Sequence, residues 1–380
     1  MSAPLVLFDL TQRLFGLGSY WPFLLLAMLP HLASVVLIRM LCTRAGASEW
    51  SATAVCVILL VFGSGWENIV FGVQVTYNLS LLCFLAHVLI TDHDGSLDRR
   101  DALGAVIGLV GVMSSGFGPF FFVGIAVLHL LRSRWARAAV AALPAAAAYA
   151  WWWLRWGADP AAASQPGSKA QVPTFVSRGI AATLDGLLSI GGLTGIAMLT
   201  LTAVVVMRRP TDPRQHLVVA LTFTMIVMFA GIGWQRIGLG ADSATASRYL
   251  YMAAILLAPL LAIACDLLGR LAPAALLAGR LILVGSAIIN AGQLRADGAT
   301  WAGQANDERI VLELVAGSGQ IAAADPERSV LVFSQEVRVA DIPYLVAEHA
   351  IVPRVPATPE QWAIVAYALG LPALAPAPTP

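Results

Sequence analysis

The stretch Gly63–Ser80, GSGWENIVFGVQVTYNLS, decides how this 380-residue chain is interpreted. Two apolar runs meet in it at a polar turn, where Glu67 and Asn68 interrupt the hydrophobic pattern. Ionisable groups at a membrane edge are costly unless water or a partner reaches them. We therefore expect the chemistry of the protein to lie on the side of the bilayer that this turn faces.

The composition is that of a membrane protein. Hydrophobic residues make up 58% of the chain, charged residues make up 12%, and the mean hydropathy is +0.77. Apolar runs near or above 18 residues recur from Trp21 to Asn290, and each is long enough, or nearly so, to cross about 30 Å of hydrocarbon. The bilayer is the expected partner. A net charge of +1 excludes a basic nucleic-acid-binding protein.

Several kinds of chemistry are not indicated. The four cysteines show no paired spacing, so no metal site is predicted. The chain has no glycine-rich phosphate loop with lysine, no HExxH and no nucleophile elbow, which argues against nucleotide-driven transport and zinc proteolysis. No motif identifies a cofactor.

We predict an all-α polytopic membrane protein with about ten transmembrane helices. Two of them are short helices within Leu103–Leu131, because SSGFGP at Ser114–Pro119 breaks that run where glycine and proline punctuate most strongly. The other predicted spans are Trp21–Cys42, Ser51–Gly63, Ile69–Thr91, Ala136–Trp156, one within Gly179–Met207, His216–Trp234, Tyr249–Leu268 and Ala274–Asn290.

Three regions follow from these patterns: an interfacial segment at 1–20, a transmembrane domain at 21–291 and a small C-terminal extension at 292–380. In the extension we predict a helix from Asn306 or Asp307 to Ala316 and a strand at Ser329–Phe333. The capping box Thr358-Pro359-Glu360-Gln361 predicts a helix to about Leu369. The tail Pro372–Pro380 is predicted to be disordered.

Arginine placement predicts the orientation of the spans, because cytoplasmic loops carry an excess of basic residues. One set of loops contains Arg39, Arg44, Arg99, Arg100, Arg132, Arg134, Arg137, Arg208, Arg209, Arg214 and Arg270. The other set contains Arg13, Arg155, Lys169, Arg178, Arg236 and Arg248. We therefore place the first set in the cytoplasm, and both termini, with the C-terminal extension, outside it.

Two outer arginines are candidate substrate-binding residues. Arg248 begins a span against the charge bias and is followed by Tyr249, and its guanidinium can bind the phosphate of a lipid carrier through paired hydrogen bonds. Arg236 lies in the same outer region. The alternative interpretation of Arg248 is an arginine that extends to the headgroups within an aromatic belt.

The turn supplies the other candidates. Glu67 is the candidate catalytic residue, as a general base or a metal ligand; the alternatives are a solvated glutamate and a structural pair with Arg248, Arg236 or Asn68. Asn68 and Gln74 are about two helical turns apart, so we expect them to share a face on which their amides bind sugar hydroxyls. Polar contact between helices is the other explanation.

Two further polar sites are predicted to be structural. His31 lies in the middle of a span beside Pro30, and we expect a neutral histidine bonded to a backbone carbonyl. Asp266 and Arg270 are four residues apart, so we expect them to pair.

Five features together resemble the GT-C class of membrane glycosyltransferases: the FGL…Y segment ahead of the first span, Pro30-His31, WENIVFGVQ at Trp66–Gln74, SSGFGP, and SRYLY at Ser247–Tyr251. The resemblance implies a bacterial plasma-membrane enzyme that moves a sugar from a polyprenyl-phosphate carrier to an acceptor on the outer face. It also implies that Arg248 and Tyr249 face the lipid phosphate.

The resemblance is incomplete at the N-terminus. The class places a catalytic acid in its first outer loop, after an initial span, whereas no acidic pair precedes Trp21 here. The family's acid therefore cannot be assigned to a residue of this chain, and we expect the first span to be missing or to come from a partner chain. The alternatives to an enzyme are a non-catalytic membrane scaffold and a lipid or solute carrier. A secondary transporter would need repeated halves, for which only the break at SSGFGP is a sign.

Overall fold

The computed structural model describes residues 2–157, 167–189, 191–192, 195–197, 200, 202–203, 212–271, 273–331, 334 and 336–372. It divides into two compact units: Met1–Val6 with Leu24–Arg295, and Leu7–Phe23 with Ala296–Pro380. The described residues contain no β-strand, and Ser329 and Arg338 form a single isolated antiparallel bridge. The chain is therefore all-α, as predicted. Residues 332 and 333 of the predicted strand, and almost all of the predicted disordered tail, lie outside the described residues.

The helices up to the middle of the chain alternate with short turns. They are α1 (Ser2–Phe15), α2 (Trp21–Arg44), α3 (Glu49–Leu60), η1 (Gly63–Gly65), α4 (Glu67–Val70), η2 (Gly72–Gln74), α5 (Val75–Thr91), α6 (Arg99–Ser114), α7 (Gly118–Leu131), α8 (Trp135–Trp152), the π-helical turn η3 (Trp153–Gly157), η5 (Lys169–Gln171) and α9 (Val172–Leu188).

The remaining helices are α11 (Pro213–Arg236), η6 (Ile237–Leu239), η7 (Ala241–Thr245), α12 (Ser247–Leu271), α13 (Pro273–Gly317), η8 (Ile321–Ala323), η9 (Val339–Asp341), α14 (Ile342–Ala347) and α15 (Pro359–Leu369).

Five helices are long and apolar enough to cross a membrane, in place of the ten spans expected from the sequence. They are Trp21–Arg44, Gly72–Thr91, Pro213–Leu239, Ser247–Arg270 and Ala274–Gly317, among the residues that the structure describes. Other apolar runs form shorter helices, because α3 has 12 residues and α7 has 14. Much of the predicted span within Gly179–Met207 lies outside the described residues. The chain is a multi-pass helical membrane protein.

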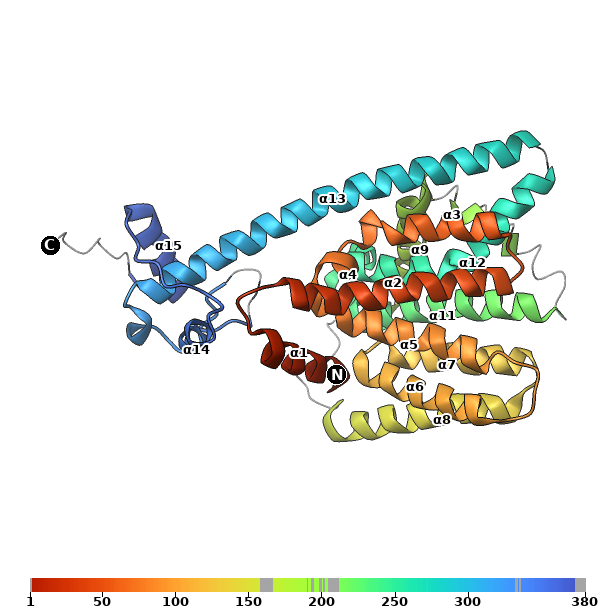
Figure 1. The fold of residues 1–380 in the computed structure, drawn as a ribbon, viewed down its shortest axis with the longest axis horizontal. Coiled ribbons are helices and arrows are strands. Elements are labelled where there is room, and N and C mark those ends of the chain that lie inside the picture. Colours follow the sequence, from red (N-terminus) through yellow and green to blue (C-terminus); the bar gives the residue numbers. More distant parts are fainter. Residues whose placement is uncertain are drawn as a thin grey trace. The chain divides into compact units, whose positions relative to one another are not determined.

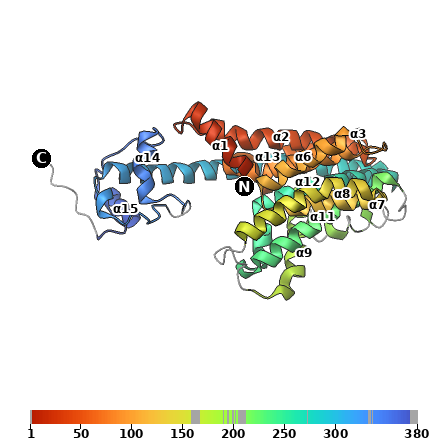
Figure 2. The same ribbon diagram turned by 90° about the horizontal axis from the view of Figure 1, so that it is seen from below.

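The core of the first unit is a bundle in which sequential helices run side by side (Figure 1). Helix α5 packs against α6, and α8 packs against both α6 and α7; Figure 2 shows α6, α7 and α8 from below. Helix α12 is the central element, since residues Tyr249–Ala258 are all buried, and it contacts α3, α9 and α11. SSGFGP forms the turn between α6 and α7, which confirms the predicted break.

Two glycines allow the polar turn to lie close to its neighbours. A Cβ on Gly65 would lie 2.6 Å from Phe62 Cδ1 and 2.9 Å from Tyr251 Cβ. A Cβ on Gly63 would lie 2.6 Å from Gln293 Cβ, and the Gly63 N–H donates to Asn290 Oδ1 at 2.9 Å. Side chains at these positions would push the turn away from α12 and α13.

The expected helix boundaries are wrong at two places. The predicted span Ile69–Thr91 is interrupted, because Phe71 is extended (φ −109°, ψ 109°) and the long helix starts only after it. Helix α13 runs without a break for 45 residues, whereas the sequence suggested a span ending at Asn290 and a separate helix near Asn306. The intervening residues Ala291–Ala305 include no proline, so nothing there stops a helix.

The second unit has its own core, formed by residues that include Leu314, Val330, Ile342 and Val365. Helix α15 begins where predicted, with half of the expected capping box: Thr358 Oγ1 accepts the Gln361 N–H at 3.3 Å, while Gln361 Oε1 accepts the N–H of Ala357 instead of Thr358. It ends at Gly370, whose φ of 67° is the left-handed conformation favoured at helix ends.

Candidate functional site

The polar turn is fixed by a pair of buried asparagines, which we call the amide clamp (Asn68 and Asn78). Asn68 Nδ2 donates to Asn78 Oδ1 at 2.9 Å, while Asn78 Nδ2 donates to Asn68 O at 2.6 Å and to Ala27 O at 3.0 Å. Both side chains are fully buried. The clamp ties α4 to α5 and α5 to α2, so it sets the position of Glu67, the residue before Asn68.

Glu67 and Arg248 form the ion pair at the centre of the candidate site. Arg248 Nη1 lies 3.4 Å from Glu67 Oε2, although the residues are 181 positions apart. The Glu67 N–H also donates to Ser247 Oγ at 3.2 Å, which holds α4 against the N-terminus of α12. Of the three structural partners considered for Glu67, the ion pair in the structure is with Arg248. The side chains are 21% and 31% exposed, so a ligand can reach both.

The other members surround this pair, and we name Glu67, Tyr77, Arg236, Arg248 and Tyr249 the Glu67 cluster. The Arg248 guanidinium lies 5.3 Å from the centre of the Tyr249 ring. The charges of Arg248, Arg236 and Glu67 all act on Tyr77, and Arg236 lies at the end of α11. The structure thus brings Glu67 and Tyr249 to Arg248, whereas Arg236 joins the cluster only through the reach of its charge at Tyr77.

Gln74 contacts the cluster from the start of α5. Its Nε2 donates to Glu67 Oε2 at 3.3 Å, and its Oε1 is buried without a hydrogen-bond partner. Asn68 and Gln74 do not share a helical face as expected, because the extended Phe71 separates them. Asn68 is turned inward to the clamp, whereas Gln74 points to Glu67.

The electrostatics of the site favour anions. The N-terminus of a long helix attracts negative charge, and here the N-terminal turn of α12 carries Arg248 as well. Burial raises the pKa of the Glu67 carboxyl above its ordinary value of 4.5, while the charge of Arg248 opposes that shift. A carboxyl with a raised pKa is a stronger base once it is ionised.

Two residues of the site were not predicted from the sequence: Tyr77 of the Glu67 cluster and Asn78 of the amide clamp. Both lie within the QVTYNLS segment, three and four residues after Gln74. That helical spacing places the three side chains on one face of α5. This spacing is the sequence signal that could have identified Tyr77 and Asn78.

The opposite ends of these helices form an arginine-rich end, defined by Arg44, Arg132, Arg134 and Arg137. Arg132 pairs with Asp92 and donates from Nη2 to Pro213 O at 2.9 Å; Arg44 Nη1 donates to Leu89 O at 3.0 Å. Arg134 pairs with Asp94, and Arg137 with Asp101. The contacts join four of the loops that the arginine count assigned to one side, whereas Arg208 and Arg209 lie outside the described residues.

One group of residues at this end could bind a metal ion, but its carboxylates already form ion pairs and helix-capping hydrogen bonds. Potential ligand atoms of His93, Asp98 and Asp101 lie within 4.8 Å of one another. Arg137 Nε, however, is 2.7 Å from Asp101 Oδ1, and the hydrogen bonds from Arg100 to Asp98 lower the pKa of that carboxyl. The two aspartates also form the capping box of α6. Because two guanidinium groups already neutralise the two carboxylates, we assign this group to helix capping.

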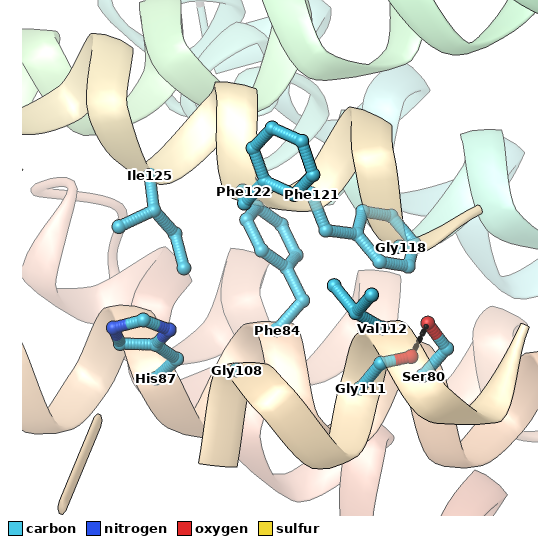
Figure 3. A pocket seen from close by; sticks show the side chains of 10 residues that line it. All are labelled: Ser80, Phe84, His87, Gly108, Gly111, Val112, Gly118, Phe121, Phe122 and Ile125. Carbon is cyan, nitrogen blue, oxygen red and sulfur yellow. Dashed lines mark hydrogen bonds between the residues drawn. The ribbon is translucent and has the colours of Figure 1, made fainter. Parts of the chain in front are cut away.

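His87 is a buried polar group between α5, α6 and α7. It lines a cavity of about 10 Å³ with Ser80, Phe84 and Phe121 (Figure 3). A cavity of this size holds about one water molecule. Gly104 and Gly108 lie against the imidazole, since a Cβ on either would approach it within 2.8 Å. The cavity is too small for a substrate.

Two expectations about isolated polar residues have different outcomes. His31 bonds to a backbone carbonyl, with Nε2 3.2 Å from Leu60 O and Nδ1 2.9 Å from the Tyr251 hydroxyl. The expectation that Asp266 pairs with Arg270 is wrong, because Asp266 bonds to other partners. Its carboxylate accepts hydrogen bonds from Ser48 N, Ser48 Oγ and Ser51 Oγ at 2.6 to 2.7 Å, because the open N-terminus of α3 offers three donors.

Comparison with known proteins identifies no family: no protein-family model, no curated protein and no solved structure matches the chain. The geometry of the Glu67 cluster is therefore the basis for the proposed function.

Proposed function

We propose that the protein is a transferase that moves a sugar from a polyprenyl-phosphate carrier to an acceptor at the outer face of a bacterial plasma membrane. The observation that carries the proposal is the Glu67–Arg248 pair. A half-exposed guanidinium and a base of raised pKa meet at the N-terminus of a helix long enough to span the membrane. This is the chemistry that a lipid phosphate and an acceptor hydroxyl require.

Each residue has one role in the proposed reaction. Arg248 binds the phosphate, and Tyr249 supports the guanidinium through its ring. The acceptor hydroxyl attacks the anomeric carbon and loses its proton to Glu67, while the bond from that carbon to the phosphate oxygen breaks. The prenyl phosphate leaves with the bonding electrons, and its new negative charge is stabilised by Arg248.

Binding to purified protein in nanodiscs tests the role of Arg248. Arg248→Ala is expected to weaken binding of a polyprenyl-phosphate sugar at least tenfold, because a charge-assisted contact is worth about 1.5–3 kcal/mol. Arg178→Ala is the matched control, since Arg178 also pairs with an acidic residue, Asp242, in the outer region. Unchanged affinity in Arg248→Ala would remove the site.

Glu67→Gln separates binding from chemistry. The amide keeps the size of the carboxylate but cannot accept the proton, so we expect binding to persist and sugar transfer to be lost. Transfer at the wild-type rate by Glu67→Gln would contradict the proposed base.

A carrier or scaffold without catalysis is the second candidate. It is favoured by one observation: Glu67 already accepts hydrogen bonds from both Arg248 and Gln74, and it is the only carboxylate in the cluster as defined above. Binding of prenyl phosphate by the wild-type protein, with no transfer to any acceptor offered, would support this candidate.

The proposed orientation has its own test. The four native cysteines are buried, so introduced cysteines can be labelled selectively. Ser243→Cys lies in η7 beside α12, and Ser96→Cys lies in the exposed loop at the arginine-rich end. A membrane-impermeant maleimide added outside intact cells should label Ser243→Cys and not Ser96→Cys; the reverse result would overturn the orientation.

A further inference from the structure

An aromatic pocket opens between the end of α6, the turn that leads to α7, and the end of α8. It has a volume of about 240 Å³ and is lined by residues that include Val112, Ser115, Gly116, Tyr149, Trp151 and Trp152. Trp151 and Trp152 end α8 just before the π-helical turn η3. Tryptophan and tyrosine are enriched at the boundary between hydrocarbon and water, and the pocket presents three such rings, Tyr149, Trp151 and Trp152.

The lining of the pocket suits a hydrocarbon better than a sugar. Most of it is carbon from aromatic rings and aliphatic side chains. The Ser115 hydroxyl already accepts the Phe117 N–H at 2.9 Å. A sugar would leave most of its hydroxyls without partners there, and each unpaired buried hydroxyl costs about 1–3 kcal/mol. An alkyl or isoprenoid chain has no such requirement.

The aromatic pocket is next to the Glu67 cluster. Phe117 directly follows the pocket residues Ser115 and Gly116, and its ring packs against two tyrosines of the cluster. The ring centre is 5.0 Å from that of Tyr77 and 6.0 Å from that of Tyr249. Arg248 in turn covers the Tyr249 ring. The Ser115–Phe117 segment thus contributes to both places, with its first two residues at the pocket and its third at the cluster.

We propose that the aromatic pocket binds the hydrocarbon chain of the lipid phosphate whose phosphate is held by Arg248. The inference rests on the proposed function of the Glu67 cluster, and it adds the place of the chain. Chain binding at a defined pocket predicts that affinity depends on chain length, up to the length that fills the pocket.

Filling the pocket is the direct test. Gly116 lines it, has an ordinary φ, and would meet no atom within 4 Å of an added Cβ, so Gly116→Trp adds bulk without disturbing the turn. The probes are methyl phosphate and single-chain alkyl and prenyl phosphates of increasing length. In the wild-type protein, affinity should rise at least tenfold from the shortest to the longest chain. In Gly116→Trp that gain should disappear, while the affinity for methyl phosphate stays the same.

Gly292→Trp is the matched control. Gly292 also has open space around its Cβ position, but it lies on α13 away from the pocket lining. The control should keep the chain-length dependence. Equal affinity for all chain lengths in the wild-type protein, or an unchanged gain in Gly116→Trp, would overturn the proposal.

A second measurement needs no bulky substitution. Alkyl phosphates with a brominated chain should quench tryptophan fluorescence, and Trp151→Phe/Trp152→Phe should remove most of that quenching. Quenching that persists in the double variant would overturn the pocket as the binding place. If Arg248→Ala binds normally while Gly116→Trp loses the chain-length gain, the phosphate role fails and the chain site stands. The converse result removes the chain site alone.

Discussion

Asn78→Ala should destabilise the protein more than any other single amide removal around the turn, because one side chain makes three hydrogen bonds there. Its Nδ2 donates to two backbone carbonyls and its Oδ1 accepts from Asn68, at 2.6 to 3.0 Å. Hydrogen bonds between membrane helices average about 0.6 kcal/mol, and buried ones in general about 1 kcal/mol. Three bonds at these values give about 2–3 kcal/mol.

Ser80→Ala provides the scale for that prediction. Ser80 lies on the same helix, is equally buried, and donates one hydrogen bond, to Gly111 O at 2.8 Å. Its removal should cost about 0.6–1 kcal/mol. Both variants are measured by denaturant unfolding in the same detergent, where about 1.4 kcal/mol is a tenfold change in the unfolding equilibrium.

The same two variants are also compared in ligand binding. Loss of the amide clamp frees the turn that carries Glu67, so Asn78→Ala should also weaken prenyl-phosphate binding, whereas Ser80→Ala should not. If Asn78→Ala is no less stable than Ser80→Ala, the clamp does not hold the turn and our account of the site geometry is wrong.

Three further predictions address other parts of the molecule. The raised pKa of Glu67 means that the folded state holds this proton more tightly than the unfolded state does. The contribution of Glu67 to stability is therefore fully present below pH 4.5 and is lost as the pH rises through the raised pKa. Glu67→Gln should remove this component from the pH dependence of unfolding, and an identical profile would contradict it. Gly124→Ala should cost about 1–3 kcal/mol, since the new Cβ would lie 2.0 Å from Thr224 Oγ1, and Gly124→Ala/Thr224→Ala should recover most of that loss in thermal unfolding. Thr358→Ala should cost about 1 kcal/mol by removing the cap of α15, detectable as faster amide exchange in the second unit; Thr358→Ser should keep normal protection.

Local patterns predicted those parts of the fold that local interactions determine. Glycine and proline in SSGFGP separate α6 from α7, and Thr358 caps α15 through its own side chain. The break at Phe71 could not be found in this way, because Ile69, Val70 and Phe71 form an apolar run with no proline beside it. It depends on the contact between Asn68 and Asn78, which exists only when α4 folds back on α5.

The partners of the site residues could not be predicted from the sequence either, because they lie far apart in the chain. Glu67 had three candidate partners in sequence, and only the packing of α4 against α12 selects Arg248. The same limit explains Asp266, for which an arginine one helical turn away was outweighed by three donors from the start of α3, more than 200 residues earlier. Contacts set by the spacing along one helix can be predicted from the sequence. The choice between partners on different helices cannot.

The ion pairs of the arginine-rich end bear on how the chain enters the membrane. In the folded protein Arg132, Arg134 and Arg137 are each matched by an aspartate from the segment Asp92–Asp101, so this end presents little unbalanced charge. Acidic residues contribute little to topology, which means that the arginines act on the nascent chain before these partners are in place. In the orientation proposed above, the same three side chains would first direct the polypeptide during insertion, and in the folded protein they pair with aspartates that lie from the end of α5 to the first turn of α6.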